Sequence, residues 1–258
     1  MTIRNRQISR RARIICGLGF IVFLLVLWQL LAMKMGKSYL LPSPLQVVQN
    51  IAANWNELWV IHMGATLAVM GTGCAVSIIL GIILAILMDL HPGIERLLYP
   101  VLTFTQTVPV LCLAPVLVLW FGYSFLMRVI VTVLVTFFPI TVNVFDGFRA
   151  VQASRTELLS TYGAGRWQQF RLLRFPTALP GFFTGLQIAL PWAAVGAVIS
   201  EWLGAPAGVG VVSKNAMMSL DAAGLLAPLV LLSAVVLLLN AVLYLLKRKI
   251  AGYNTNVI

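Results

Sequence analysis

The residues able to perform acid–base or metal chemistry are few and scattered in this sequence. His62 and His91 are the two histidines, and a whole apolar run separates them, so neither a metal pair nor a catalytic dyad is expected. The three cysteines fall in apolar runs without a Cys or His partner at the spacing of metal ligands: Cys16, Cys74 and Cys112. The sequence therefore predicts a protein that is not an enzyme and has no metal site.

Four polar residues inside long apolar runs are the remaining candidates for a functional site. Placing a polar group in an apolar environment costs free energy, so such residues mark binding or packing contacts. Gln106, Asn143 and Gln187 can hydrogen-bond a passing solute or bridge neighbouring helices. Glu201 is the only acid within such a run, and it is either solvated near the end of the run or a gate residue that faces a pathway.

The composition places these residues in a membrane protein. Of the 258 residues, 60% are hydrophobic and 10% are charged, and the mean hydropathy is +0.97. Soluble domains have about 45 to 50% apolar and about 25% charged residues. The formal net charge is +11, but the basic residues lie between apolar runs, without the interleaved aromatic residues of a nucleic-acid surface. We therefore expect the chain to contact the lipid bilayer and not to bind nucleic acid.

Six apolar runs, uncharged except for Glu201, are long enough to cross a bilayer, whose hydrocarbon core of about 30 Å requires about 20 helical residues. They cover residues 14–33, 66–88, 101–121, 129–145, 181–203 and 225–246. Small residues in the second and fifth runs allow close helix contact, among them Gly71, Gly73, Ser77, Gly185 and Gly196. We predict an all-α integral membrane protein of six transmembrane helices, forming one domain over residues 1–258 with its core at about 62–248.

The basic residues predict the orientation, because the side of the membrane with more Lys and Arg faces the cytoplasm. With the N-terminus inside, the outer side holds only a few of the 18 Lys and Arg residues: Lys34, Lys37, Arg128 and Lys214. An even number of spans then places both termini in the cytoplasm. The basic start is also typical of a signal peptide, but its apolar run exceeds the usual length of about 7 to 15 residues, so we expect it to remain as the first span. Asp89 and Glu95, in a short inner loop, are expected in a solvated turn.

The longest polar gap, residues 146–180, falls on the cytoplasmic side between the fourth and fifth runs. Ser154 or Thr156 predicts a helix cap, with Glu157 in the first turn as a capping box requires. Gly163 and Gly165 can end this helix, because glycine accepts left-handed backbone angles without strain.

Prolines in the third run, Pro109 and Pro115, are places where a helix can bend.

A second amphipathic helix follows the glycines, with apolar residues at every third position: Trp167, Phe170 and Leu173. Pro176 is expected to stop this helix, and Pro180 to lie in the first turn of the fifth span. The helix pair either lies on the membrane surface or docks into a groove of a soluble partner, and both interpretations stay open.

This loop resembles the EAA loop of bacterial ABC importer permeases, whose pattern is E-A-A-x(3)-G-x(9)-I-x-L-P. Glu157, Gly163, Leu173 and Pro176 match the pattern, whereas Leu158 and Leu159 replace the two alanines. Other segments are similar to the branch that carries taurine, alkanesulfonates, nitrate and thiamine-precursor pyrimidines: LLPSP, QTVPVLCLAPVLVLWFG, FFPITVN, ALPGFFTGLQIAL and SEWLGAPAGVG. The resemblance covers nearly the whole chain.

The resemblance implies a permease subunit in the bacterial inner membrane that pairs with a second copy of itself. It also implies two cytoplasmic ABC ATPase subunits and an extracytoplasmic solute-binding protein. The residues that it assigns to the ATPase-coupling loop are Glu157, Leu158, Leu159, Gly163, Ala164, Gly165, Leu173 and Pro176. The chain has no G-x-x-x-x-G-K-[ST] phosphate loop, so we expect ATP and Mg²⁺ to bind the partner ATPase and no cofactor to bind this chain.

Two transport mechanisms are compatible with the composition alone. An ion-coupled secondary transporter is the alternative to the ATP-driven importer, but it predicts inverted repeats and buried ionisable residues, and neither is evident beyond Glu201. The few fixed charges along the runs favour a small neutral or aromatic solute. The segments FTQTVPV, VTFFPITVN and SEWLGAP, which contain Gln106, Asn143 and Glu201, resemble the pyrimidine-precursor carriers slightly more than the other members of the branch. This favours a thiamine-precursor pyrimidine as the substrate, and a sulfonate, taurine or nitrate remains open.

Overall fold

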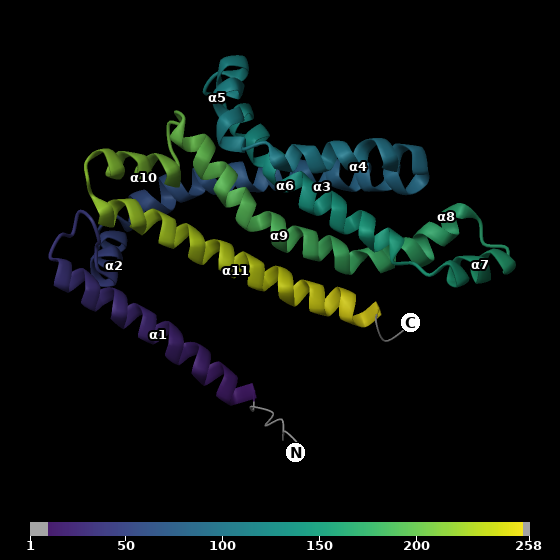
Figure 1. Cartoon of the computed structure of the whole chain (residues 1–258), viewed down its shortest axis with the longest axis horizontal. Coiled ribbons are helices and arrows are strands. Elements are labelled where there is room, and N and C mark those ends of the chain that lie inside the picture. Colours follow the sequence, from purple (N-terminus) through teal and green to yellow (C-terminus); the bar gives the residue numbers. More distant parts are fainter. Residues whose placement is uncertain (1–9, 255–258) are drawn as a thin grey trace.

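The computed structural model describes residues 10–254, and this part of the chain is built from helices and contains no strand (Figure 1). The elements in chain order are α1 (Arg10–Met35), α2 (Pro44–Ala53), the π-helical segment η1 (Glu57–Met63), α3 (Gly64–Leu90), α4 (Pro92–Thr107), α5 (Val110–Phe121), α6 (Phe125–Arg149), α7 (Ala153–Thr161), α8 (Arg166–Gln169), the π-helical segment η2 (Phe170–Arg174), α9 (Phe175–Trp202), α10 (Val209–Met218) and α11 (Ala222–Asn254). The predicted all-α class is confirmed.

Four helical segments are long and apolar enough to cross a membrane. They are Glu57–Leu90, Phe125–Arg149, Arg166–Trp202 and Ala222–Ile250, and they correspond to the second, fourth, fifth and sixth predicted runs. The first run falls in α1, whose apolar described part, Gly19–Met35, is shorter. With the bent pair α4 and α5 counted as one span, the described residues provide up to five, and the number six stays a prediction.

The third run, residues 101–121, is divided between two helices and is wrong as one straight helix. Helix α4 ends at Thr107, and α5 starts at Val110 with its axis turned by 96°. Pro109 has no backbone N–H and disfavours the helical conformation at the residue before it, and Val108 is accordingly extended, with φ −83° and ψ 120°. Pro115 lies inside α5 and does not end it. The pair forms either a broken span or a re-entrant loop.

The core of the molecule is the packing of α6 along both α3 and α9. A Cβ atom added to Gly185 of α9 would lie 2.8 Å from the Pro139 carbonyl oxygen of α6. A Cβ atom at Gly73 of α3 would lie 2.5 Å from Thr132 Cγ2 of α6. The close helix contact predicted at these two glycines is confirmed, because no larger residue fits without moving a helix.

Short helices occupy the two ends of the molecule. Helices α7 and α8 project at the end where α11 terminates, whereas α2 and α10 lie at the opposite end (Figure 1). Helix α2 packs against α11 and also contacts α1. Trp28 of α1 donates its indole N–H to the Pro42 carbonyl at 3.0 Å, and this bond fixes the segment that leads into α2. Each end therefore presents a different polar loop system.

Candidate functional sites at the two ends of the molecule

Helix α7 begins one residue before the predicted cap. Gln152 is the extended residue that precedes it, with ψ 134°, and its side chain caps no backbone N–H. Ser154 and Thr156 lie inside the helix, so the predicted capping box with Glu157 is wrong. A side-chain cap acts only at the residue just before the first helical turn, and here that residue is Gln152, because the helix starts at Ala153.

Gly163 ends α7, as predicted, with a left-handed φ of +78°. Its N–H donates to the Ser160 carbonyl at 2.9 Å, and the Ala164 N–H donates to Leu159 at 3.0 Å. Gly165 has a different place, since it precedes α8 and its N–H donates to Gln168 Oε1 at 2.9 Å. The glycine bend is therefore built from one helix end and one helix start.

The return segment runs from α8 through η2 into α9 as one helical stretch, Arg166–Trp202. Leu173 lies half-buried in η2. The predicted stop at Pro176 is wrong, because the helical backbone continues through Arg174 and Phe175 into α9, and the π-helical segment η2 directly precedes the proline. Pro180 lies inside α9 and not at its start. The loop therefore connects directly to the core helix.

The tip of the loop exposes apolar and aromatic side chains. The exposed fractions are 57% for Leu158, 80% for Tyr162 and 71% for Trp167, and Leu159 is half-buried. No side chain of α7 is buried, and Glu157 is exposed as well. An exposed apolar surface on a projecting loop marks a contact with a protein or a membrane.

Phe170 anchors the return segment to the core. Its ring lies 5.8 Å from the ring of Phe148 on α6 and 5.8 Å from that of Trp167. Of the three apolar residues predicted to share a face, Phe170 therefore packs inward while Trp167 stays exposed. The sequence pattern identified the face but did not separate the anchoring residue from the exposed one.

Two ion pairs join the ends of the short inner loop to this region: residues 91–93 are exposed, as a solvated turn predicts, but Asp89 and Glu95 each pair with an arginine. Arg174 at the end of η2 pairs with Asp89 of α3, and their side chains are 33% and 13% exposed. Arg149 of α6 pairs with Glu95 of α4 at 2.6 Å, and these side chains are 61% and 29% exposed. The partners are 85 and 54 residues apart, so no local sequence signal could have found them.

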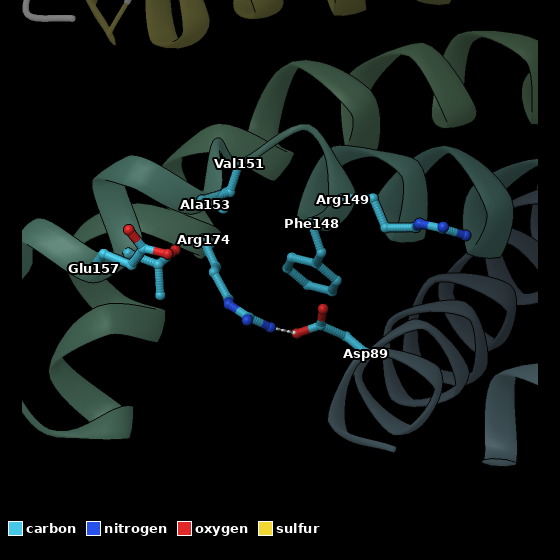
Figure 2. Close-up of a pocket in the computed structure, with 8 residues that line it drawn as sticks. Asp89, Phe148, Arg149, Val151, Ala153, Glu157 and Arg174 are labelled. Carbon is cyan, nitrogen blue, oxygen red and sulfur yellow. Dashed lines mark hydrogen bonds and ion pairs between the residues drawn. The ribbon is translucent and has the colours of Figure 1, made fainter. Parts of the chain in front are cut away.

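A cavity of about 420 Å³ lies between α7 and the Asp89–Arg174 pair. Figure 2 shows Arg174 directed toward Asp89, Phe148 beside them and Glu157 on the opposite wall. Because this space separates the wall with Glu157 from the wall with Asp89, the contact between the loop and α3 is made through Arg174. The arrangement connects the loop to two core helices at separate points.

At the opposite end, Glu201 of α9 is buried, with only 1% of its surface exposed, so the solvated interpretation is wrong. Its carboxylate accepts a hydrogen bond from the Thr66 hydroxyl at 2.7 Å and another from the Gly210 N–H at 2.8 Å. Gly208, with φ +147°, lies directly against the carboxyl group. The carboxylate therefore holds the turn between α9 and α10.

Three successive backbone N–H groups at the start of α10 receive acceptors from other elements. The Gly208 N–H donates to His62 Nδ1 at 3.2 Å, and the Val209 N–H donates to Thr66 Oγ1 at 2.8 Å. Glu201 accepts from the third, that of Gly210. A helix start leaves such N–H groups without partners in the helix, so the carboxylate and its neighbours stabilise α10. His62 and Thr66 were not predicted to have this role.

The three amide residues proposed for a pathway are dispersed in the structure. Asn143 donates to the Pro139 carbonyl of its own helix at 2.8 Å. Gln106 is exposed in the last turn of α4, and Gln187 is half-buried in α9. No hydrogen bond joins any two of them within residues 10–254. Their role in a pathway remains a prediction.

The fold and these two ends define the class: a multi-pass helical membrane protein whose core helices connect a projecting loop to a buried polar cluster. Residues 77–252 match the family model described as the binding-protein-dependent transport system inner membrane component. The chain belongs to this family, and it is the permease subunit of an ABC importer. The ion-coupled alternative is therefore set aside.

The family membership agrees with similarity to individual permeases. The chain is 47% identical over 214 residues to the formylaminopyrimidine transport permease protein ThiX of Halalkalibacterium halodurans, covering 83% of this chain and 86% of the relative. It is 31% identical over 239 residues to the riboflavin transport system permease protein RibX of Chloroflexus aurantiacus, with 92% and 89% coverage. It is 27% identical over 245 residues to the taurine transport system permease protein TauC of Escherichia coli, with 92% and 88% coverage.

Proposed function

We propose that this chain forms the translocation pathway for a small solute that an extracytoplasmic binding protein delivers. It crosses the bacterial inner membrane six times with both termini in the cytoplasm, as one domain that pairs with a second copy. The α4–α5 pair serves as the third span in this topology, and α1 serves as the first. Gln106, Asn143 and Gln187 remain the candidate pathway residues, and Glu201 remains the candidate gate.

The exposed apolar tip of the α7–α8 loop carries the proposal for ATP coupling. Leu158, Tyr162 and Trp167 are exposed at the end of the molecule farthest from α10, where a soluble subunit can reach them (Figure 1). An apolar helix end of this kind fits a groove on a soluble partner. Two copies of a cytoplasmic ABC ATPase bind here, and they hold the ATP and Mg²⁺ that this chain has no phosphate loop to bind.

The substrate that we propose is a thiamine-precursor pyrimidine. The support is the 47% identity to a formylaminopyrimidine permease, compared with 27% to a taurine permease over a similar length. The four core segments of this chain are apolar, which suits an uncharged aromatic solute better than a densely charged one. Sulfonate, taurine and nitrate are the competing substrates.

Co-purification tests the coupling role. The wild-type permease is expected to bring down an ABC ATPase from its source membranes, and the complex is expected to hydrolyse ATP. Replacing both Leu158 and Leu159 by Ala removes exposed or half-buried apolar surface, so we expect recovery of the ATPase to fall about tenfold. Since α7 has no buried side chain, the yield of folded permease should stay unchanged. Undiminished recovery of the ATPase would contradict the role of the leucine pair.

Uptake tests the substrate. Cells or proteoliposomes with the complete complex are expected to take up formylaminopyrimidine in an ATP-dependent manner. An excess of about tenfold of taurine, of an alkanesulfonate or of nitrate should leave this uptake unchanged, because a selective transporter binds these competitors at least about ten times more weakly. Uptake of taurine instead of the pyrimidine would overturn the proposed substrate and leave the transport class intact.

A further inference from the structure

The coupling loop has two attachments to the core, and they differ in their chemistry. Phe170 packs against Phe148 and so joins the return segment to α6 by apolar contact. Arg174, four residues later, joins the same segment to α3 through Asp89. Since α3 and α6 pack along each other for much of their length, the loop contacts both members of a core helix pair.

The Asp89–Arg174 pair is more protected from solvent than the other ion pair near the loop. Asp89 is 13% exposed, whereas Glu95 in the second pair is 29% exposed and its partner Arg149 is 61% exposed. Removing one member of a protected pair leaves a charge without a partner in a poorly solvated site, and this costs more than removing an exposed one. The Asp89–Arg174 contact is therefore the one that resists separation.

Open space, and not side-chain packing, separates the tip of the loop from α3. The cavity of about 420 Å³ lies between Glu157 on α7 and the ion pair, and α7 buries none of its side chains. In Figure 2 the guanidinium of Arg174 extends across the end of this cavity to Asp89. A push on α7 consequently reaches α3 through the return segment and Arg174.

We propose that the Asp89–Arg174 ion pair is a positioning element that transmits movement of the coupling loop to α3. This inference rests on the proposed ATPase-coupling function of the loop. When the ATPases change conformation on binding nucleotide, the loop moves, and Arg174 moves the inner end of α3 with it. Arg149 and Glu95 join α4 to α6 and take no part in this transmission.

The test follows the inner end of α3 in the purified complex with its ATPase. Leu90, the last residue of α3, is 72% exposed and accepts a reporter as Leu90→Cys, with Cys16, Cys74 and Cys112 replaced by Ala. The rate of reaction with a maleimide is measured without nucleotide and with MgATP and vanadate. In this parent we expect the two rates to differ about threefold, which corresponds to a modest shift between two conformations.

Arg174→Gln and Asp89→Asn are expected to abolish the difference between the two rates while the ATPase still co-purifies. Arg174→Lys keeps the charge and should keep the difference. Glu95→Gln, in the more exposed pair, is the matched control and should keep it too. The proposal is overturned if the parent shows no nucleotide-dependent difference, if Arg174→Gln retains it, or if Arg174→Lys behaves as Arg174→Gln. Absence of any ATPase in the parent preparation would instead refute the proposed coupling function.

Discussion

Single residues at the α9–α10 turn show how far the sequence indicates a role and where it stops. Glu201 stood out because it is the only acid within an apolar run. Its partner Thr66 is 135 positions away, and His62 lies 146 positions from Gly208, so only the fold brings them together. The polar cluster could not be predicted, because each partner alone has an ordinary place at a helix start.

Gly208 provides a test of this cluster. It has φ +147°, and a Cβ atom there would fall against the Glu201 carboxyl group, which cannot yield without losing its bonds to Thr66 and Gly210. Gly208→Ala should therefore lower the free energy of unfolding by about 3 kcal/mol. Gly36→Ala is the matched control, since Gly36 has φ +62° with nothing within 4 Å, and about 1 kcal/mol is expected. Unfolding in detergent, followed by tryptophan fluorescence, measures both variants. Equal decreases in the free energy of unfolding would contradict the steric contact between Gly208 and the Glu201 carboxyl group.

At the scale of elements, the length of the apolar runs predicted most of the long helices, because a helix that crosses a bilayer needs about 20 apolar residues in succession. It failed at residues 101–121, where two prolines stand in one run and only one of them ends a helix. Hydropathy places the residues on both sides of Pro109 in one uncharged run, so it contains no information about a 96° turn. The predicted start of α7 was wrong because it was inferred from a capping side chain. The helix instead begins after Gln152, whose backbone is extended and whose side chain caps no N–H.

Two glycines, one in the contact between α6 and α9 and one with free space around it in α3, give stability predictions of opposite sign. A Cβ atom at Gly185 would lie 2.8 Å from the Pro139 carbonyl oxygen and 3.0 Å from Ile140 Cα, both backbone atoms that cannot rotate away. Gly185→Ala should therefore destabilise the protein by about 2 kcal/mol. Gly71 in α3 has nothing within 4 Å, so Gly71→Ala should stabilise by about 0.5 kcal/mol through helix propensity. Denaturant titration in one detergent compares them, and a stabilising Gly185→Ala would show that α6 and α9 are not in close contact.

At the scale of the whole molecule, the two polar clusters lie at opposite ends of two core helices, α3 and α9. Thr66 lies in the first turn of α3 and Asp89 next to its last residue, whereas Arg174 directly precedes α9 and Glu201 lies next to its last residue. The turn at the α10 end and the loop at the α7 end are thus connected by two continuous helices (Figure 1). Alternating access requires that an event at one end changes the other, and a rigid helix with a polar anchor at each end provides a physical route.

This arrangement has a topological consequence that labelling can check. If the α4–α5 pair crosses the membrane, Tyr123 lies outside with Ser219, and Ser160 on α7 lies in the cytoplasm; all three are exposed. In a background without Cys16, Cys74 and Cys112, a membrane-impermeant maleimide should react in intact cells with Tyr123→Cys and Ser219→Cys. Ser160→Cys should react only after the membrane is permeabilised. Reaction of Ser160→Cys in intact cells would reverse the orientation derived from the basic residues, and a protected Tyr123→Cys would contradict the outer placement of the connection between α5 and α6.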